Sequence, residues 1–240
     1  MISIIIPTLN EEKFIEGTLR ALASALTLPH ETIISDGKST DRTAEIASRY
    51  ADRVLVYKGV ARQTIAEGKN EGAKAARGDF FVFLDADVRI PDTNVFFSAL
   101  LMRFERDHEL VAVTVALGVE PAYATLADRA IFTLLNSTYF LFNNVLHIGN
   151  GSGEFQMIRA SAFRRVKGYR EDLPAGEDND IFRRLSRIGK TRFCGDLTVF
   201  HSGRRAHKKG WPKVLYSWVK NGLSVFLFNK SAYKEWEKIR

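Results

Sequence analysis

The chain has 240 residues, of which 45% are hydrophobic and 26% are charged. This composition suits one α/β domain with a sizeable core and excludes a disordered chain. A single cysteine, Cys194, excludes a disulfide framework and a cysteine-rich zinc site, and we expect it to be a small buried residue near a strand. The opening MISIIIPTLNEE lacks the basic region and the apolar length of a signal peptide, which predicts a cytosolic working domain.

The formal net charge of +7 is concentrated at the end of the chain. Residues 201–240 hold ten Lys or Arg against two Glu, which leaves 25 basic and 26 acidic residues in the first two hundred. A basic tail suits nucleic acid, an anionic membrane surface or a phosphate-bearing substrate. Composition leaves these three open.

Short apolar runs alternate with helical patterns along the first half of the chain. Expected strands are 2–6, 31–37, 53–59 and 80–87, and expected helices are 10–26, 39–51 and 61–76. Asn10 is a candidate N-cap of the first helix, and Ser39 or Thr40 of the second. Strands that read as continuous apolar runs predict a mostly parallel, Rossmann-like sheet covered by helices on both faces.

Polar residues follow three of these strands at the point where each strand ends. In open α/β sheets the ligand lies beyond the carboxyl ends of the strands. Asp85 and Asp87, one residue apart after a buried strand, suit a hard divalent cation such as Mg²⁺ or Mn²⁺. Two aspartates one residue apart, without other supporting motifs, are more often part of a surface turn. The residues at these three strand ends are Pro7, Asn10, Glu11, Asp36, Asp85 and Asp87.

Several motifs occur together in a fixed order. They are PTLNEE, SDGKSTDRT, GKNEGAKAARGDFFVFLDAD, GSGEFQMIRASAFRRVKGYRED and AGEDNDIFRRLSRIG. As a set, from Met1 to His201, they resemble a family 2 glycosyltransferase with the GT-A fold, and among its members those that act on lipid-linked acceptors such as polyprenyl phosphates or glycolipids.

The resemblance implies a nucleotide-sugar donor and inversion at the anomeric carbon. It places Asp85 and Asp87 on the metal, Mn²⁺ or Mg²⁺, and the donor diphosphate. Residues around the nucleoside would be Pro7, Asn10, Glu11 and Asp36, with Lys69 near it. Two departures stand out: Ser35 replaces the first of two acids that the family often has before this glycine, and Arg89 follows the acid pair, where it could contact phosphate or form an exposed salt bridge.

The segment GEDND opens a predicted helix after a Pro-Gly loop, so its acids lie at a positive helix terminus. In the family the second acid is the general base, which implies Asp178, while Glu177 would position the acceptor or the base. Asp180 reads as a helix cap. A plain N-cap is the alternative interpretation of the whole segment.

The run TRFCGDLTVFHSGRR reads as a strand that ends in His201. A lone histidine is more often a packed or surface residue than a ligand. At this place in the GT-A fold, however, it can be the third metal ligand. Arg204 and Arg205 just beyond it would then clamp the diphosphate, because a guanidinium matches phosphate geometry.

Two further segments point to a membrane. Residues 130–153 hold no Lys, Arg, Asp or Glu but several Asn, which favours a core or interfacial helix beside the acceptor over a membrane span. The run WPKVLYSWVKNGLSVFLF, 211–228, combines Trp and Tyr with lysines and suits a helix at a membrane interface. A helix packed on the domain is the alternative. We therefore predict a GT-A domain at 1–205 and a basic amphipathic tail at 206–240.

The sequence thus favours a metal-dependent inverting glycosyltransferase on the cytoplasmic side of a membrane. GDP-mannose is the preferred donor, a lipid-linked or glycolipid molecule the expected acceptor, and nucleic acid is not expected as a partner. Further membrane helices beyond this chain would fit the same interpretation. A sugar-phosphate nucleotidyltransferase lacks support because no glycine-rich phosphate loop lies near the N-terminus. A non-catalytic nucleotide- or nucleic-acid-binding module would not need acids at three strand ends and one helix start.

Overall fold

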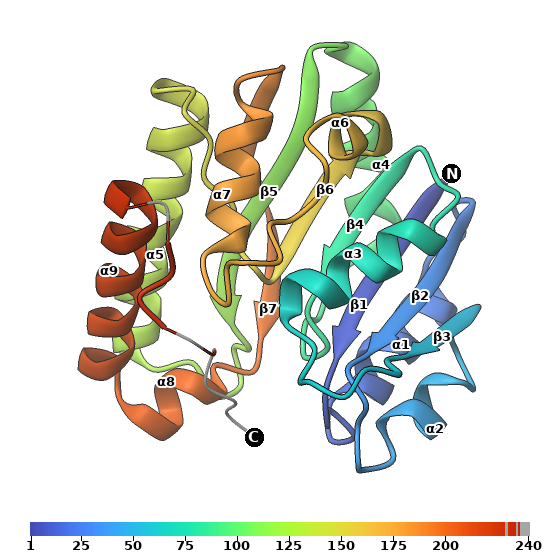
Figure 1. Cartoon of the computed structure of the whole chain (residues 1–240). Coiled ribbons are helices and arrows are strands. Elements are labelled where there is room, and N and C mark those ends of the chain that lie inside the picture. The colour runs from blue at the N-terminus through green and yellow to red at the C-terminus, as the bar shows by residue number, and fades with distance from the viewer. Residues whose placement is uncertain (229, 234, 236–240) are drawn as a thin grey trace.

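The structure, a computed structural model, describes residues 1–228, 230–233 and 235. In this part of the chain one sheet has the strand order β3-β2-β1-β4-β6-β5-β7 (Figure 1). The strands are β1 (Ile2–Thr8), β2 (His30–Asp36), β3 (Arg53–Val56), β4 (Phe80–Leu84), β5 (Leu110–Val119), β6 (Phe155–Arg159) and β7 (Lys190–His201). β6 runs antiparallel to both neighbours and the other pairs are parallel, which confirms the predicted mostly parallel sheet.

Helices cover both faces of the sheet, as predicted. One face carries α1 (Ile15–Ala25), α2 (Thr43–Ala47), α4 (Thr93–Arg106) and α5 (Leu126–Phe140), which runs on into the π-helix η1 (Leu141–Val145). The opposite face carries α3 (Ile65–Ala75), α6 (Ala160–Arg165) and α7 (Glu177–Leu185). After β7 the chain forms α8 (Arg204–Lys209) and α9 (Trp211–Phe228).

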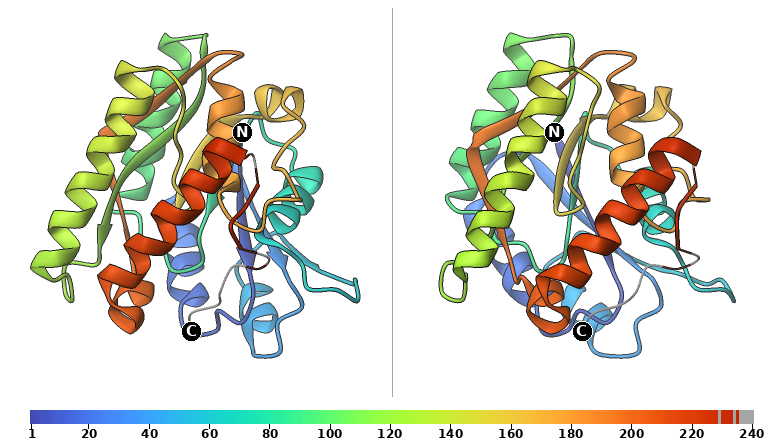
Figure 2. Two further views of the ribbon diagram at one scale, coloured as in Figure 1. Left: turned by 60° about the vertical axis from the view of Figure 1, so that its left-hand side comes forward. Right: turned by 90° about the vertical axis from the view of Figure 1, so that its left-hand side faces the viewer.

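One buried carboxylate fastens this last helical pair to the sheet domain. Asp128 is 1% exposed and closes a capping box with Thr125 at the start of α5. Its two oxygens also pair with His207 Nε2 (2.9 Å) and Trp211 Nε1 (2.8 Å). Burial opposes the charge, but the hydrogen bonds from His207, Thr125 and Trp211 lower the pKa of Asp128 to about 2. The first turn of α9 is therefore held against α5, and both views of Figure 2 show the two helices diverging from that end.

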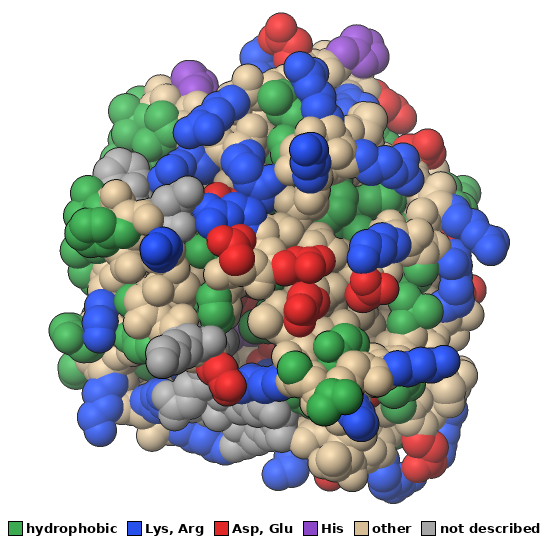
Figure 3. Space-filling view, in the orientation of Figure 1, with side chains coloured by type: hydrophobic (Ala, Val, Ile, Leu, Met, Phe, Trp, Pro, Cys, Tyr) green, Lys and Arg blue, Asp and Glu red, His purple; other side chains and the backbone are tan. Residues whose placement is uncertain are grey.

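The two faces of α9 differ in what they contact. Val214, Asn221 and Val225 face the domain and are buried. The outer face is apolar and exposed, and hydrophobic side chains gather along this edge of the molecule in Figure 3. The exposed apolar residues of α9 are Leu215, Tyr216, Val219, Leu223, Leu227 and Phe228. No helix in the described part of the chain is both long and apolar enough to cross a bilayer.

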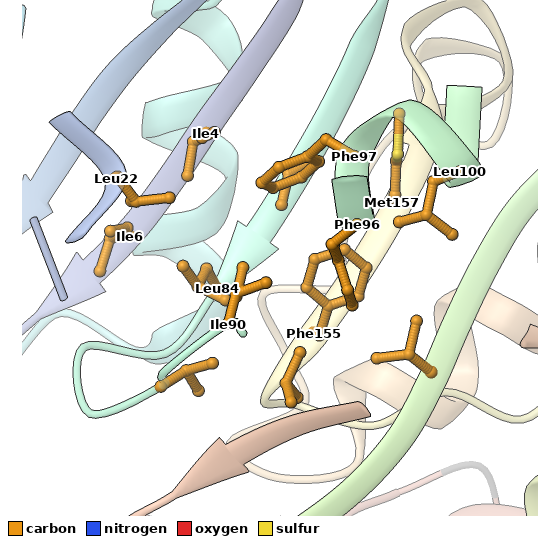
Figure 4. Close-up of a cluster of buried hydrophobic side chains, with 14 of the residues drawn as sticks. Ile4, Ile6, Leu22, Leu84, Ile90, Phe96, Phe97, Leu100, Phe155 and Met157 are labelled. Atoms are coloured by element: carbon orange, nitrogen blue, oxygen red, sulfur yellow. The ribbon is translucent and has the colours of Figure 1, made fainter. Parts of the chain in front are cut away.

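Alternate residues of the strands build the two halves of the core. Ile4 and Ile6 point to the face that α1 and α4 cover, whereas Ile5 points to α3 and its neighbours. Figure 4 shows Ile4 and Ile6 with Leu22, and Phe96 and Phe97 of α4 beside Phe155. Each such buried side chain contributes about 1.5–3 kcal/mol. The core thus fixes the strands whose ends carry the candidate site residues.

Local helix ends differ from the sequence-based expectation. α1 begins at Ile15, so the N-cap prediction for Asn10 is wrong: Asn10 has a φ of 55° and its Oδ1 accepts a hydrogen bond from Thr40 N (2.7 Å). α2 likewise begins only at Thr43. The hydrogen bond from Thr40 to Asn10 instead links the loop after β2 to the loop after β1. Local helix propensity does not encode such a long-range contact. Asp180 lies inside α7, where it pairs with Arg184 (2.7 Å), so it is not a cap.

Other local predictions are confirmed, and one remains open. Cys194 is buried in β7. Arg89 forms an ion pair with Glu120 (2.7 Å) and is about half exposed, which matches the salt-bridge interpretation. The division into 1–205 and 206–240 stays a prediction, and residues 229, 234 and 236–240 of that tail lie outside the described residues.

We expect Asp128→Ala to lower the free energy of unfolding by about 3 kcal/mol, because it removes a buried hydrogen-bonded carboxylate and a helix cap. Urea denaturation at pH 7 measures this loss. The folded pKa of about 2 lies below the usual 3.8, so this stabilisation is present above pH 4 and disappears as the pH falls toward 2.

Asp196→Ala serves as the control, because Asp196 is 67% exposed in a surface pair with Arg103. It should change stability by less than about 1 kcal/mol. Equal losses in the two variants would show that Asp128 does not anchor the C-terminal helices.

Candidate active site

The candidate site lies where the carboxyl ends of β2, β1 and β4 meet the end of β7. The first three strands are parallel neighbours, so their terminal loops share one edge of the sheet. A two-way backbone pairing adds β7: Arg89 N donates to Phe200 O (2.7 Å) and Phe200 N donates to Arg89 O (2.9 Å). The predicted residues Asp85, Asp87 and His201 are therefore brought together, although they are far apart in the sequence.

The predicted nucleoside residues organise the loops after β1 and β2. Asp36 is 1% exposed, and its Oδ1 accepts hydrogen bonds from Thr8 Oγ1 (2.9 Å) and Ser39 Oγ (2.5 Å). Asn10 N donates to Ser39 Oγ (2.7 Å), and Pro7 lies in β1, partly buried. Hydrogen bonds within the chain thus fix the two loops to each other. Nucleoside contact by Pro7, Asn10 and Asp36 remains a prediction.

Three carboxyl groups crowd the end of β4. Asp85 and Asp87 follow the strand, and Glu154 enters from the residue before β6, whose carbonyl accepts the Asp85 N–H (3.2 Å). Burial and then the Glu154 charge raise the pKa of Asp85 well above its usual range, and burial raises the pKa of Glu154. Sequence reasoning missed Glu154, although it stands in the quoted GSGEF motif. Carboxylate oxygens are the ligands that a hard divalent cation prefers.

His201 fits a metal less directly. Its Nδ1 accepts a hydrogen bond from Gly203 N (3.1 Å), and its Nε2 is buried without a hydrogen-bond partner among the described residues. A neutral ring that accepts at Nδ1 carries its proton on Nε2. Ligation through Nε2 would therefore require loss of the Gly203 bond. In the described part of the chain no three His, Cys, Asp or Glu side chains are arranged to hold a metal ion.

Arg204 already contacts two predicted site acids. It forms a two-fold ion pair with Glu11 (2.6 and 2.9 Å), and its Nε lies 3.4 Å from Asp87 Oδ2, which also accepts a hydrogen bond from Ser202 Oγ. Burial and the neighbouring Arg204 lower the pKa of Arg205. Both arginines thus lie at the acid cluster, where a diphosphate could replace the carboxylates as their partner. Sequence reasoning did not predict the Arg204 to Glu11 pair.

The predicted general base, Asp178, forms an ion pair with the buried Lys69. Lys69 of α3 is 1% exposed, and its Nζ lies 2.5 Å from Asp178 Oδ1 and 3.2 Å from Glu177 Oε1. Burial opposes the ammonium charge, but Asp178 and Glu177 hold the pKa of Lys69 well above its usual range. The prediction placed Lys69 near the nucleoside. The structure puts its charge against the base, and the donor contact remains a prediction.

Glu177 and Asp178 share this one cation and differ in exposure. The Glu177 side chain is 5% exposed and that of Asp178 is 18% exposed. Burial and then the Asp178 charge raise the pKa of Glu177 to about 7. Gln156 Nε2 also donates to Asp178 Oδ1 (3.1 Å), and Tyr169 OH donates to Gln156 Oε1. Sequence reasoning missed Gln156 and Tyr169. Asp178 is the more exposed acid of the two, and its role as the general base remains a prediction.

About two thirds of the chain matches a protein-family model. The family model for glycosyl transferase family 2 matches residues 3–167. The chain belongs to this family. The matched range includes Asp36, Lys69, Asp85 and Asp87 and stops short of the Glu177, Asp178 pair.

Among related family 2 proteins is the succinoglycan biosynthesis protein ExoA of Rhizobium meliloti. It is 29% identical over 214 residues, which are 81% of this chain and 61% of that protein. The PGL/p-HBAD biosynthesis glycosyltransferase of Mycobacterium tuberculosis is 31% identical over 113 residues, 45% of this chain and 43% of the relative. The chain thus spans about three fifths or less of the length of these relatives.

Solved structures confirm the GT-A fold. The mannosyltransferase PcManGT from Pyrobaculum calidifontis, in complex with GDP-Man and Mn²⁺, superposes with a TM-score of 0.66 at 19% identity and covers 84% of this chain and 56% of its own. The low identity limits this likeness to the fold.

Glu177 should make stability fall as the pH rises. Its folded pKa of about 7 lies above the usual 4.5, so the folded state holds the proton more tightly, and this stabilisation is lost between pH 4.5 and 7. Glu177→Gln cannot titrate. We expect a smaller difference in unfolding free energy between pH 5 and pH 8 in this variant than in the wild type, measured by urea denaturation at both pH values.

Glu109→Gln is the matched control, because Glu109 is 74% exposed at the far end of the sheet. It should leave the wild-type pH dependence unchanged. A Glu177→Gln variant with the wild-type pH dependence would contradict the role of burial at this carboxyl group.

Proposed function

We propose that this chain is a metal-dependent inverting glycosyltransferase that moves a sugar from a nucleotide-sugar donor to a lipid-linked or glycolipid acceptor at a membrane surface. One observation carries the proposal: Gln156, which contacts the base candidate Asp178, lies on β6 beside the end of β4 that carries the acid pair. The Asp178 charge raises the pKa of Asp85, and the Lys69 charge acts on both groups. Donor and acceptor chemistry can therefore meet there.

The donor side needs charge stabilisation on the leaving diphosphate. Asp85, Asp87 and Glu154 are the residues that would hold Mn²⁺ or Mg²⁺, with His201 as a further ligand after its ring changes partners. When bound, such an ion acts as a Lewis acid on the departing phosphate oxygens. Arg204 and Arg205 would add positive charge, once the diphosphate takes the place of Glu11 and Asp87 as the Arg204 partner.

The acceptor side needs a deprotonated nucleophile. Asp178 would take the proton of an acceptor hydroxyl, and the oxygen would then displace the diphosphate from the opposite side of the anomeric carbon. Glu177 would hold Lys69 and, through it, the base. An acceptor that is already an ionised lipid phosphate would hardly need this proton transfer.

The identity of the nucleotide rests on weaker support. The structural neighbour PcManGT holds GDP-Man and Mn²⁺, which agrees with our preference for GDP-mannose. The Staphylococcus aureus TarS 1-349 structure contains UDP-GlcNAc and superposes with a TM-score of 0.65 at 19% identity, covering 98% of this chain and 68% of its own. A UDP-sugar is therefore the second candidate.

The outer face of α9 supports a membrane position. Leu215, Val219, Leu223 and Leu227 recur every fourth residue on the exposed side, and the exposed Lys213 and Lys220 lie on the same helix. Phe140, Leu141 and Val145 of α5 and η1 are exposed apolar residues as well. Apolar residues beside lysines suit the headgroup layer of an anionic membrane. We propose attachment to the cytoplasmic side, with or without further membrane helices beyond this chain.

A thermal-shift screen of GDP, UDP and their sugars with Mn²⁺ tests the donor, since a ligand at a hundred times its Kd adds about 2.7 kcal/mol to the free energy of unfolding.

In transfer assays with the donor that this screen selects, we expect Asp87→Ala to lose about a hundredfold or more in rate while the fold stays intact. Asp172→Ala, at a 66% exposed surface pair, should keep the wild-type rate. An Asp87→Ala rate within tenfold of wild type would mean that the acid pair is structural.

Co-sedimentation with vesicles of 30% anionic lipid tests the membrane surface. We expect binding that falls with salt, because each lysine near an anionic surface contributes about 1 kcal/mol. The double variant Val219→Glu with Leu223→Glu should lose most of this binding. Met102→Glu, at an exposed apolar position of α4, is the control. Equal binding by all three proteins, or none by the wild type, would assign the outer face of α9 another role.

A further inference from the structure

We infer that Lys69, Gln156 and Tyr169 clamp one oxygen of Asp178 so that only the other, Oδ2, receives the acceptor proton, and that Gly153 keeps the space in front of Oδ2 open. This inference rests on the proposed function. It assigns Gln156, Tyr169 and Gly153 as positioning residues of the reaction.

One oxygen of Asp178, Oδ1, accepts hydrogen bonds from Lys69 Nζ (2.5 Å) and from Gln156 Nε2 (3.1 Å). Lys69 and Gln156 are almost completely buried, at 1% and 0% exposure. Two donors from α3 and β6 thus occupy Oδ1, which cannot take a proton without losing at least one of these bonds.

A hydrogen bond from Tyr169 fixes the orientation of the Gln156 amide. Tyr169 OH donates to Gln156 Oε1, so the amide nitrogen must face Asp178. Burial raises the pKa of Tyr169 well above its usual range, which keeps the phenol a donor. The backbone of Tyr169 is held at both ends by Asn70, whose Nδ2 donates to Tyr169 O and whose Oδ1 accepts from Tyr169 N, each at 2.9 Å. Asn70 follows Lys69 directly in α3, so one turn of helix supports the whole clamp.

Gly153 lies next to the other oxygen of Asp178, Oδ2. A Cβ placed on Gly153 would lie 2.9 Å from Asp178 Oδ2 and 3.7 Å from Asp178 Cγ, and it would meet no other atom within 4 Å. Gly153 has no left-handed φ, so its backbone does not require glycine. The missing side chain therefore serves one contact, the access to Oδ2.

In the reaction, proton transfer to Asp178 Oδ2 accompanies displacement of the diphosphate. The acceptor O–H bond breaks and its proton moves to Oδ2, while the acceptor oxygen forms a bond to the anomeric carbon. The bond from that carbon to the diphosphate oxygen breaks, and the nucleoside diphosphate leaves with the electron pair. A carboxylate held within a narrow range of orientations is effective here, since a displacement of 1 Å can cost about a hundredfold in rate.

The test compares Gly153→Ala with Gly17→Ala, because a Cβ at Gly17 meets no atom within 4 Å. In transfer to a hydroxyl acceptor we expect kcat to fall about tenfold or more for Gly153→Ala. The Kd for the donor nucleotide should stay within about twofold of wild type in both variants, and Gly17→Ala should keep the wild-type kcat. A Gly153→Ala enzyme with wild-type kcat, or with weaker donor binding alone, would overturn the inference.

Gln156→Met and Tyr169→Phe test the clamp itself. Both should lower kcat without changing donor affinity, and Tyr169→Phe should have the smaller effect. Both should leave the KM for the hydroxyl acceptor within about twofold of wild type, because the clamp orients Asp178 for proton transfer and does not bind the acceptor.

Tyr50→Phe is the control for the tyrosine, because it removes a hydroxyl that donates to Glu16 (2.9 Å) away from the site. A wild-type kcat in Gln156→Met and Tyr169→Phe, or a fall in kcat matched by an equal rise in the KM for the acceptor, would reduce these residues to a structural role and overturn the clamp. If neither the wild type nor Gly17→Ala transfers sugar to any hydroxyl or phosphate acceptor, the proposed function fails and the inference with it. If both transfer sugar to phosphate acceptors alone, the inference fails and the proposed function stands. If both transfer, and Gly153→Ala does so equally well, only the inference fails.

Discussion

The need to neutralise a buried ammonium organises the centre of this molecule. Lys69 has almost no contact with water, and a lone buried charge costs several kcal/mol. Its partners Glu177 and Asp178 come from the first turn of α7, more than a hundred positions along the chain. This pairing fixes α3, α7 and the loop before α7 relative to one another. The acids that could perform chemistry are therefore also the acids that neutralise the core of the fold.

The sequence predicted the parts of the fold that depend on short-range pattern. The apolar runs at β1, β2 and β4 were located correctly because each strand is buried on both faces and reads as a continuous hydrophobic segment. The position of the acids at their ends followed from the same reading. The GEDND segment was also placed at a helix start, since a Pro-Gly loop precedes a clear helical pattern.

What could not be predicted depends on contacts between distant residues. Asn10 reads as a helix cap by local rules, but its amide is taken by a loop thirty positions away. Glu154 and Gln156 occupy ordinary positions of a strand motif, and only the antiparallel pairing of β6 with β4 brings them to the acids. The buried environment of Lys69 has no local signal at all, because lysines on amphipathic helices are normally solvated.

The two-way backbone pairing between Arg89 and Phe200 has a thermodynamic consequence. It joins the loop that carries Asp85 and Asp87 to the end of the strand that carries His201, and the bonds of Asp36 and Asn10 do the same for the first two loops. Fixing a flexible loop residue costs about 1–2 kcal/mol of conformational entropy. Because the chain's own hydrogen bonds hold these loops, we expect little of the intrinsic interaction energy to be lost to ordering them on binding. Affinity at this edge should therefore follow the contacts that a ligand makes, with a small entropic penalty from the protein backbone.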